Sequence, residues 1–369
     1  MLVLIALANV HVYAFGHPLG PRGYPRDLSV ADQVIVVLQM LLVDGRAYPL
    51  FALLFGYGIV QLSRRRTSAG ISTSSVTSLV RRRGRWMLLI GFVHGVLLWP
   101  GDIIGAYGLI ALVFAGVLVR RSTRALVVMT AAGTLVSGLL YSGASLELPD
   151  SDMFLPSMAE ERAGSAMVFR IFEWLAIGLG FGFAMAFGAV ALGVLAGRRG
   201  VLDDPEHFEP LLRGLAVVGL GTAVVLGLPL ALMAAQVIDS PSVTISLAFG
   251  FAHALGGYAG GVGYAALFGL IAIRLRRRRS GIVASAVVES GRRSMSSYLA
   301  QSLVFVAFLP AWSMGYGGRL SVWQLTLVAL GAWALITALA ACAGRAGVRG
   351  PAEVLLRRLT YGRPSSLRR

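Results

Sequence analysis

Residues Arg81–Tyr107 have the sequence RRRGRWMLLIGFVHGVLLWPGDIIGAY. This stretch joins an arginine cluster to a short apolar run with His94 at its middle, and then to a turn that carries Asp102. A second apolar segment follows directly. The pattern predicts a membrane hairpin with an ionisable side chain inside the bilayer. Because such a side chain is costly there, His94 is a candidate functional residue by default.

Composition extends this prediction to the whole chain. The 369 residues are 56% hydrophobic and 14% charged, with a mean hydropathy of +0.75, whereas soluble domains are about a quarter charged. The apolar residues come in long runs rather than in the stripes of amphipathic helices or strands. We therefore expect an all-α, polytopic integral membrane protein with about ten transmembrane helices.

The net charge of +16 is a misleading pointer to a nucleic-acid partner. All 33 basic residues are arginine, and most of them lie in clusters between apolar runs. Clusters of this kind set the orientation in the membrane and contact lipid headgroups. No soluble domain is visible that would display a nucleic-acid surface. The lipid bilayer is therefore the expected partner, and nucleic acid is not.

Several segments depart from simple transmembrane runs. A break near Asp44-Gly45-Arg46 is expected to separate an interfacial or tilted helix from a membrane helix at about 47–62. Residues 64–85 are basic and rich in serine and threonine, which predicts a solvated loop, and residues 281–293 are expected to form a surface helix. The other spans are expected at about 1–15, 86–99, 103–119, 125–146, 166–196, 211–237, 243–273, 296–312 and 322–343.

With this count of spans, the loops alternate between two sides of the membrane. One side then receives 27 of the 33 arginines, while the acidic segment 147–162 falls on the other. The positive-inside rule predicts that both termini are cytoplasmic. In this scheme residues 1–345 form a single transmembrane helical domain and residues 346–369 a basic cytoplasmic tail.

His94 lies nine residues beyond Arg85, or about 13 Å into the membrane at 1.5 Å per residue. It is therefore expected near the middle of the bilayer. A neutral imidazole there can act as a general base when a carboxylate orients it. Equally, the histidine can hold the bundle together through a hydrogen bond to a neighbouring helix.

Asp102 follows His94 by eight residues. In an unbroken helix this spacing gives about 80° of rotation and about 12 Å of rise, so direct contact is not expected unless Pro100 bends the chain back. Asp102 is expected at the external mouth, facing substrate or an arginine such as Arg46. Its place before Ile103 also fits a helix N-cap, and the two roles are compatible.

Other polar residues in or near the spans have simpler expected roles. Arg46 can hold an anionic group or extend to the lipid headgroups, and Glu173 is expected to pair with Arg170. Asn9 and Gln301 are expected to make interhelical hydrogen bonds.

Two further features exclude some classes of chemistry. His253 and Tyr258 lie in a glycine-rich span, HALGGYAGGVGY, whose glycines favour helix packing, because no strand precedes them to form a dinucleotide site. Cys342 is the only cysteine, which excludes an intrachain disulfide or iron–sulfur site, and it is expected to be buried in the last helix. No Walker loop or HExxH motif is present.

Four ordered segments match the motifs of one family. Asp44–Gly58, DGRAYPLFALLFGYG, is similar to kFrtLFslLFGxG, and Arg81–Tyr107 is similar to RR…GxxHxxxLWxGDIL…Y. Gly291–Ser302, GRRSMSSYLAQS, is similar to GRmsLTnYLxQS, and Gly350–Gly362, GPAEVLLRRLTYG, is similar to GPlEwLwRrlTYG. On these segments the chain resembles the YeiB-like bacterial membrane proteins, catalogued as domain of unknown function 418.

The chain also departs from this family pattern. Only Leu4–Asn9 resembles the usual opening segment, R…D…RGxAllGIllvN, and Val354 and Leu356 stand where the family favours aromatic residues. The resemblance implies a multi-pass protein of the bacterial cytoplasmic (plasma) membrane. It also implies a remote similarity to transmembrane acyltransferases, which pass an acyl group from a cytoplasmic thioester to a sugar on the far side with an intramembrane histidine.

Three hypotheses follow from the residues and the resemblance. In the first, the protein is an acyltransferase with His94 as general base and Asp102 as the orienting or substrate-binding carboxylate. No bound cofactor is expected; acyl-CoA is the co-substrate, and an envelope glycan or small molecule is the acceptor. The second is a small-solute or proton-coupled transporter that uses the same residues as a proton relay. The third is a non-catalytic membrane scaffold. The expected substrate-binding residues are Arg46, Asn9, Tyr107, Tyr298 and Gln301, the residues expected to bind coenzyme A are Arg81, Arg82, Arg83 and Arg85, and no metal ligand is expected.

Overall fold

The computed structural model describes residues 1–146, 151–239, 242–276 and 281–362. These ranges contain helices and no β-strand. The helices are α1 (Leu2–Val10), α2 (Val30–Leu42), α3 (Ala47–Thr67), α4 (Thr73–Leu97), α5 (Ile103–Arg120), α6 (Thr123–Ala144), α7 (Pro156–Ala159), α8 (Ala163–Glu173), the π-helical η3 (Trp174–Phe181), α9 (Gly182–Arg199), α10 (Glu209–Ala234), α11 (Val243–Arg276), α12 (Ile282–Arg292), α13 (Ser294–Phe308), α14 (Val322–Arg345) and α15 (Pro351–Tyr361), with 3-10 turns η1 (His11–Tyr13), η2 (Pro21–Gly23) and η4 (Tyr316–Gly318).

Seven helical stretches among the described residues are long and apolar enough to cross a membrane. This confirms an all-α, polytopic membrane protein. Two shorter apolar helices, Leu2–Tyr13 and Ser294–Phe308, complete the bundle together with α4. The total of ten spans and the cytoplasmic termini stay predictions. The seven stretches are Val30–Thr67, Ile103–Arg120, Thr123–Ala144, Ala163–Arg199, Glu209–Ala234, Val243–Arg276 and Val322–Arg345.

The arginine clusters at 64–66, 120–121 and 198–199 lie together at one end of the bundle, which we call the arginine-rich end. There the Arg64 guanidinium donates to the carbonyl of Arg198 at 2.8 Å, and the Arg198 guanidinium donates to the carbonyl of Arg121 at 2.8 Å. At the other end, loop residues pair instead, as when Gly16 donates its backbone N–H to the carbonyl of Asp152 at 2.8 Å. The two classes of loop thus lie at opposite ends, as the charge pattern requires. Of the acidic segment, residues 147–150 lie outside the described ranges.

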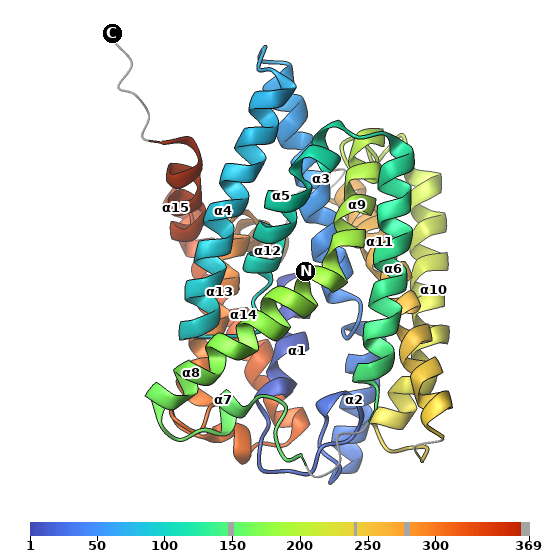
Figure 1. The fold of residues 1–369 in the computed structure, drawn as a ribbon, viewed down its shortest axis with the longest axis vertical. Coiled ribbons are helices and arrows are strands. Elements are labelled where there is room, and N and C mark those ends of the chain that lie inside the picture. Colours follow the sequence, from blue (N-terminus) through green and yellow to red (C-terminus); the bar gives the residue numbers. More distant parts are fainter. Residues whose placement is uncertain (147–150, 240–241, 277–280, 363–369) are drawn as a thin grey trace.

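The predicted solvated loop over residues 64–85 is wrong. Helix α3 continues to Thr67 and α4 begins at Thr73, so that only a short turn separates them. Ser72 caps α4 by accepting from the backbone N–H of Ser75. Arginine is a good helix former, and a helix satisfies its backbone within itself. The basic segment therefore projects from the bundle as two helix ends (Figure 1).

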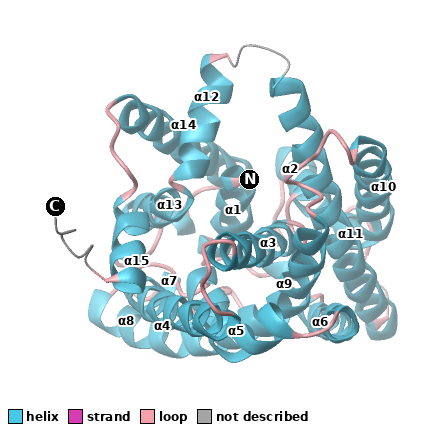
Figure 2. Cartoon of the chain, turned by 90° about the horizontal axis from the view of Figure 1, so that it is seen from above, coloured by secondary structure: helices cyan, strands magenta, loops and turns pink. Residues whose placement is uncertain are grey.

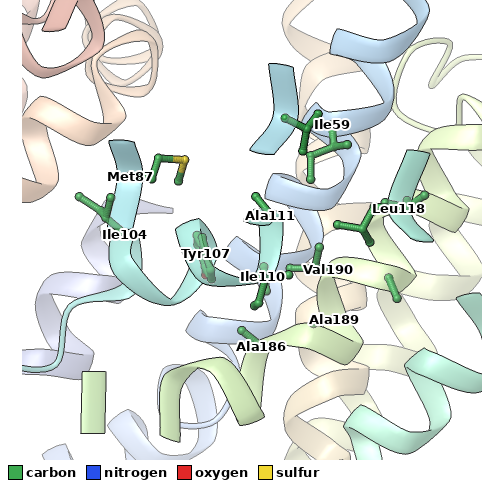
Figure 3. Close-up of a cluster of buried hydrophobic side chains, with 14 of the residues drawn as sticks. Ile59, Met87, Ile104, Tyr107, Ile110, Ala111, Leu118, Ala186, Ala189 and Val190 are labelled. Atoms are coloured by element: carbon green, nitrogen blue, oxygen red, sulfur yellow. The ribbon is translucent and has the colours of Figure 1, made fainter. Parts of the chain in front are cut away.

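Helix α3 lies near the centre of the bundle when it is viewed along the helices (Figure 2). It crosses α9 closely, because a Cβ atom at Gly56 or Gly193 would overlap a backbone carbonyl of the facing helix. Small residues permit such approach in membrane proteins. Around this crossing, α3, α4, α5 and α9 share one apolar cluster (Figure 3), which includes Ile59, Met87, Tyr107, Ile110 and Val190.

Three local expectations can be compared with the helices. The break at Asp44-Gly45-Arg46 is confirmed: α2 ends at Leu42, α3 begins at Ala47, and Gly45 has a left-handed φ of 71°. Helix α12 occupies the predicted surface segment. Cys342, predicted to be buried, is exposed on α14, because it lies on the outward face of that helix, where an apolar residue can face lipid.

Candidate functional site

The candidate site is built around His94, in the last turn of α4. Its Nδ1 atom lies 2.8 Å from Oδ1 of Asp102, and its Nε2 atom lies 2.9 Å from Oγ of Ser302 on α13. The exposed fractions of the three residues are 3%, 1% and 3%. The structure therefore aligns a carboxylate, an imidazole and a hydroxyl in a buried relay.

A reversal of the chain brings Asp102 back to His94. Helix α4 ends at Leu97, and the backbone N–H groups of Leu98 and Trp99 both donate to the carbonyl of His94. Pro100 and Gly101 follow in the turn. The separation of about 12 Å calculated for an unbroken helix does not arise, because the helix stops before Asp102.

Asp102 also caps α5, as predicted. Its Oδ2 atom accepts from the backbone N–H of Gly105 at 2.5 Å, while Oδ1 faces His94. One carboxylate thus starts a helix and orients the imidazole. The predicted place at an external mouth is wrong, because α8 and η3 cover this tip of the hairpin, and Asp102 is buried.

Residues of α8 hold the covered tip in place. Nε of Arg170 donates to the carbonyl of Val96 at 2.7 Å, and its guanidinium lies 4.8 Å from the ring centroid of Trp312. Glu173 accepts from the backbone N–H and the hydroxyl of Ser157. Arg170 and Glu173 still interact electrostatically, but each makes its hydrogen bonds to a separate partner, since the helix end and the loop over it both offer polar groups that burial would leave unsatisfied.

Helix α13 supplies the third member of the relay. Ser302 was not among the predicted site residues, although it closes the GRRSMSSYLAQS motif. One turn earlier, the ring of Tyr298 packs against the imidazole of His94, with centroids 5.1 Å apart. Gln301 instead donates to the carbonyl of Leu2 at 3.3 Å, the interhelical role expected for it.

A cavity of about 260 Å³ runs beside this relay. It extends from Arg83, Ser294 and Leu356 to Tyr107 and Tyr298. Most of its wall is apolar. Nε of Arg83 and the hydroxyls of Tyr107 and Tyr298 are buried there without a hydrogen bond of normal geometry. The other lining residues are Met1, Ile5, Phe51, Leu54, Phe55, Met87, Ile103, Ile104 and Met295.

The four arginines predicted to bind coenzyme A divide into two groups. Arg83 lines the cavity, while Arg81, Arg82 and Arg85 are exposed on α4. All four lie on the stretch of α4 that leads from the arginine-rich end toward His94. The cavity therefore connects an arginine at one end with tyrosines beside the relay at the other.

Comparison with known proteins finds one family model and two bacterial proteins that are similar to the chain. The family model described as "Protein of unknown function (DUF418)" matches residues 196–363. The chain is 31% identical over 120 residues to the uncharacterized protein YeiB of Escherichia coli (strain K12), covering 30% of this chain and 27% of YeiB. It is 22% identical over 392 residues to the uncharacterized protein YxaH of Bacillus subtilis (strain 168), covering 98% of this chain and 92% of YxaH.

These matches support a YeiB-like DUF418 family for the chain. The stretch matched by the family model contains Ser302 and Tyr298, whereas His94 and Asp102 precede it. No solved structure matches the chain significantly. The alignment with YeiB spans about a quarter of that protein's length.

The protein has a second buried polar cluster at the break between α2 and α3. Arg22 grips the carboxylate of Asp44 through Nη2 and Nε, at 3.0 and 3.2 Å, and Nε2 of His253 lies 3.2 Å from the same carboxylate. Arg46 donates to the carbonyl of Ala223 and lies 2.7 Å from Nε2 of His253. These contacts join three helices and a loop.

Arg46 does not have the partners expected from the sequence. It is fully buried, at 0% exposed, and so does not extend to the headgroups, and its contacts are in the second cluster rather than with Asp102. Glycines of the neighbouring helices make room for it, because a Cβ atom at Gly227 or Gly260 would overlap its side chain. The glycine-rich span is thus a packing feature, as predicted.

The remaining predicted substrate-binding residues are dispersed. Asn9 is half-buried on α1 and makes no side-chain hydrogen bond within the described residues. Arg46 belongs to the second cluster, and Gln301 ties α13 to α1. Only Tyr107 and Tyr298 line the cavity. In the described part of the chain, no group of three or more acidic, histidine or cysteine side chains is arranged to hold a metal ion.

Proposed function

We propose that the protein is a membrane-embedded acyltransferase of the bacterial plasma membrane. It takes an acyl group from cytoplasmic acyl-CoA and passes it to an extracytoplasmic glycan or small-molecule acceptor. His94 acts as the general base. The observation that carries this proposal is the buried relay from Asp102 through His94 to a hydroxyl.

The relay suits a general base because of how its members are ordered. A carboxylate at Nδ1 accepts a hydrogen bond from the N–H of that nitrogen, so that the lone pair of Nε2 faces the hydroxyl. Burial keeps water away and strengthens each charge interaction. A histidine held in this way can take a proton from a hydroxyl as the hydroxyl attacks a carbonyl.

The cavity supports a thioester donor. A donor of this class has anionic phosphates at one end, a long uncharged arm and a reactive carbonyl at the other. The cavity offers Arg83 at one end, an apolar wall along its length, and tyrosine hydroxyls beside the relay. Arg81, Arg82 and Arg85 are exposed on the same stretch of α4 as Arg83 and add positive charge that phosphates would bind through charge-assisted hydrogen bonds.

The deciding experiment compares donor binding with thioester hydrolysis. Acetyl-CoA and longer acyl-CoAs are titrated into purified wild-type protein, His94→Ala and His207→Ala, and release of free thiol is followed in parallel. His207 is exposed near the start of α10 and is the matched control. We expect all three forms to bind the donor, and only His94→Ala to lose hydrolysis.

A carrier would give a different result. If none of the folded forms binds any acyl-CoA, the acyltransferase proposal fails. Reconstituted vesicles would then be tested for transport of small solutes, with proton uptake as a second readout. In a carrier, His94→Ala would abolish proton-coupled uptake, because an intramembrane histidine paired with a carboxylate can relay protons.

A further inference from the structure

We propose that Ser302 is the first acceptor of the acyl group and carries it as a covalent serine ester. This inference rests on the proposed acyltransferase function and adds the route that the acyl group follows. In this scheme, His94 deprotonates a residue of the protein before it deprotonates the final acceptor. The geometry that points to it is the contact between Oγ of Ser302 and Nε2 of His94, at 2.9 Å.

The direction of the Ser302 hydroxyl is informative. A serine inside a helix commonly donates to the carbonyl four residues earlier, as Ser142 does to Gly138 at 3.0 Å. Within the described residues, Ser302 makes its side-chain hydrogen bond to His94 instead. The hydroxyl is therefore directed at a base and is not engaged in a hydrogen bond to a carbonyl of its own helix.

The order of the three groups matches an activated nucleophile. The carboxylate of Asp102 fixes the imidazole through Nδ1, and Nε2 is left to accept the proton of Ser302. This arrangement of acid, histidine and hydroxyl recurs on unrelated folds that form acyl-serine intermediates, and it is recognised by geometry rather than by sequence position. Here the members come from α4, the cap of α5, and α13.

Access to Ser302 depends on Tyr298. The cavity is lined by Tyr298 but not by Ser302 or His94, and the Tyr298 ring packs on the imidazole. This ring is thus the partition between the cavity and the relay. A rotation of the side chain would let a thioester carbonyl reach Ser302, and the hydroxyls of Tyr107 and Tyr298 are available as donors to the carbonyl oxygen.

The reaction balances in two halves. In the first, Oγ of Ser302 bonds to the thioester carbon as its proton moves to Nε2 of His94; the carbon–sulfur bond then breaks, and the leaving thiolate takes that proton. In the second, an acceptor hydroxyl gives its proton to His94 and bonds to the acyl carbon. The ester bond to Ser302 breaks, and Oγ recovers the proton. No redox partner is needed.

The test is covalent labelling without an acceptor. Purified full-length protein is mixed with radiolabelled acetyl-CoA, quenched in acid at short times, and examined by intact mass and peptide mapping. We expect wild type to gain one acyl group on the peptide that contains Ser302. Ser302→Ala should lose the label, and Ser302→Cys should regain it as a thioester that neutral hydroxylamine releases.

Ser297→Ala is the matched control, because Ser297 is another buried serine of α13. It should label like wild type. Loss of Ser302 is also expected to slow thioester turnover by roughly 10²–10⁴-fold, the range of a lost acid–base partnership. Circular dichroism and size-exclusion elution establish that each variant is folded. If Ser302→Ala does not fold, the proposal is tested by the wild-type protein alone: the label must map to the peptide that contains Ser302.

Failure of this inference can be told apart from failure of the proposed function. If wild type hydrolyses acyl-CoA without a covalent label, or if the label maps to His94 or Cys342, the serine intermediate is wrong while the acyltransferase proposal stands. Turnover by folded Ser302→Ala at the wild-type rate would likewise exclude the serine intermediate alone. If wild type neither binds nor hydrolyses acyl-CoA, both proposals fall.

Discussion

Gly91 of α4 lies directly against the carboxylate of Asp102, and a Cβ atom at Gly91 would overlap Oδ2 of Asp102 and the backbone of Gly105. The same oxygen accepts the N–H of Gly105 that starts α5. The absence of a side chain at one position therefore allows the hairpin to close and the relay to form.

Gly91→Ala tests this close approach. The added methyl group should push Asp102 away from His94 and cost about 1–3 kcal/mol of stability, as overpacking usually does. The midpoint temperature of thermal unfolding and the rate of thioester turnover should both fall. Gly58→Ala is the control, because nothing lies within 4 Å of a Cβ atom there, and alanine is the better helix former. Equal stability of Gly91→Ala and wild type would show that the helices are not in this contact.

Asp102→Asn separates the two roles of Asp102. Asparagine is a good N-cap, so the stability of the hairpin should be largely kept. Its amide cannot hold the imidazole as a carboxylate does, so turnover should fall by roughly 10²–10⁴-fold. Asp102→Ala should lose the cap as well and cost a further ~1 kcal/mol of stability. Turnover that survives in Asp102→Asn would rule out the orienting carboxylate.

The hairpin of α4 and α5 shows which features could be predicted from the sequence and which could not. Its turn predicted the N-cap at Asp102, which the structure confirms, because a helix cap depends on local pattern. The place of His94 inside the membrane stays a prediction. The contact between His94 and Asp102 depends on where α4 stops, and helix ends are the least certain part of a prediction from sequence. Pro100 was the one local signal that α4 ends before Asp102.

Contacts between segments that are distant in the sequence could not be predicted from it. Ser302 lies 208 residues from His94, and although it closes the GRRSMSSYLAQS motif, the motif does not indicate which side chain it faces. In the same way, His253 and Asp44 meet only because α11 packs beside the break after α2. Charge composition predicted which loops share an end of the bundle, but it mistook the projecting helix ends for a loop.

Arg83→Ala should weaken acyl-CoA binding more than Arg82→Ala. Arg83 is the member of the cluster that lines the cavity with an unpartnered Nε, while Arg82 is exposed. Hydrogen bonds to charged groups contribute about 1.5–3 kcal/mol, which predicts a loss of roughly 10–100-fold in affinity. Isothermal titration calorimetry at two salt concentrations measures the affinity of each variant for acyl-CoA. Equal losses for the two variants would mean that phosphates bind at the surface and not in the cavity.

Asp44→Asn should destabilise the protein without affecting the relay. The carboxylate balances Arg22 and contacts His253 in a buried cluster, and removing one partner of a buried ion pair costs about 3–5 kcal/mol. Asp203→Asn is the control, because its pair with Arg64 is largely solvent-exposed and such pairs are worth about 0–1 kcal/mol. Denaturant unfolding in detergent measures both. Unchanged stability in Asp44→Asn would show that the second cluster is not structural.

Helix α4 also fixes a length. Arg83 and His94 lie on one continuous helix, eleven residues apart, and are therefore separated by about 16 Å along its axis. In the proposed reaction, the helix sets the distance between the site that binds the phosphates of the donor and the site where its carbonyl reacts. Only a carrier arm of matching reach can engage both ends at once. The protein would then select its donor by the length of that arm before the identity of the acyl group is tested.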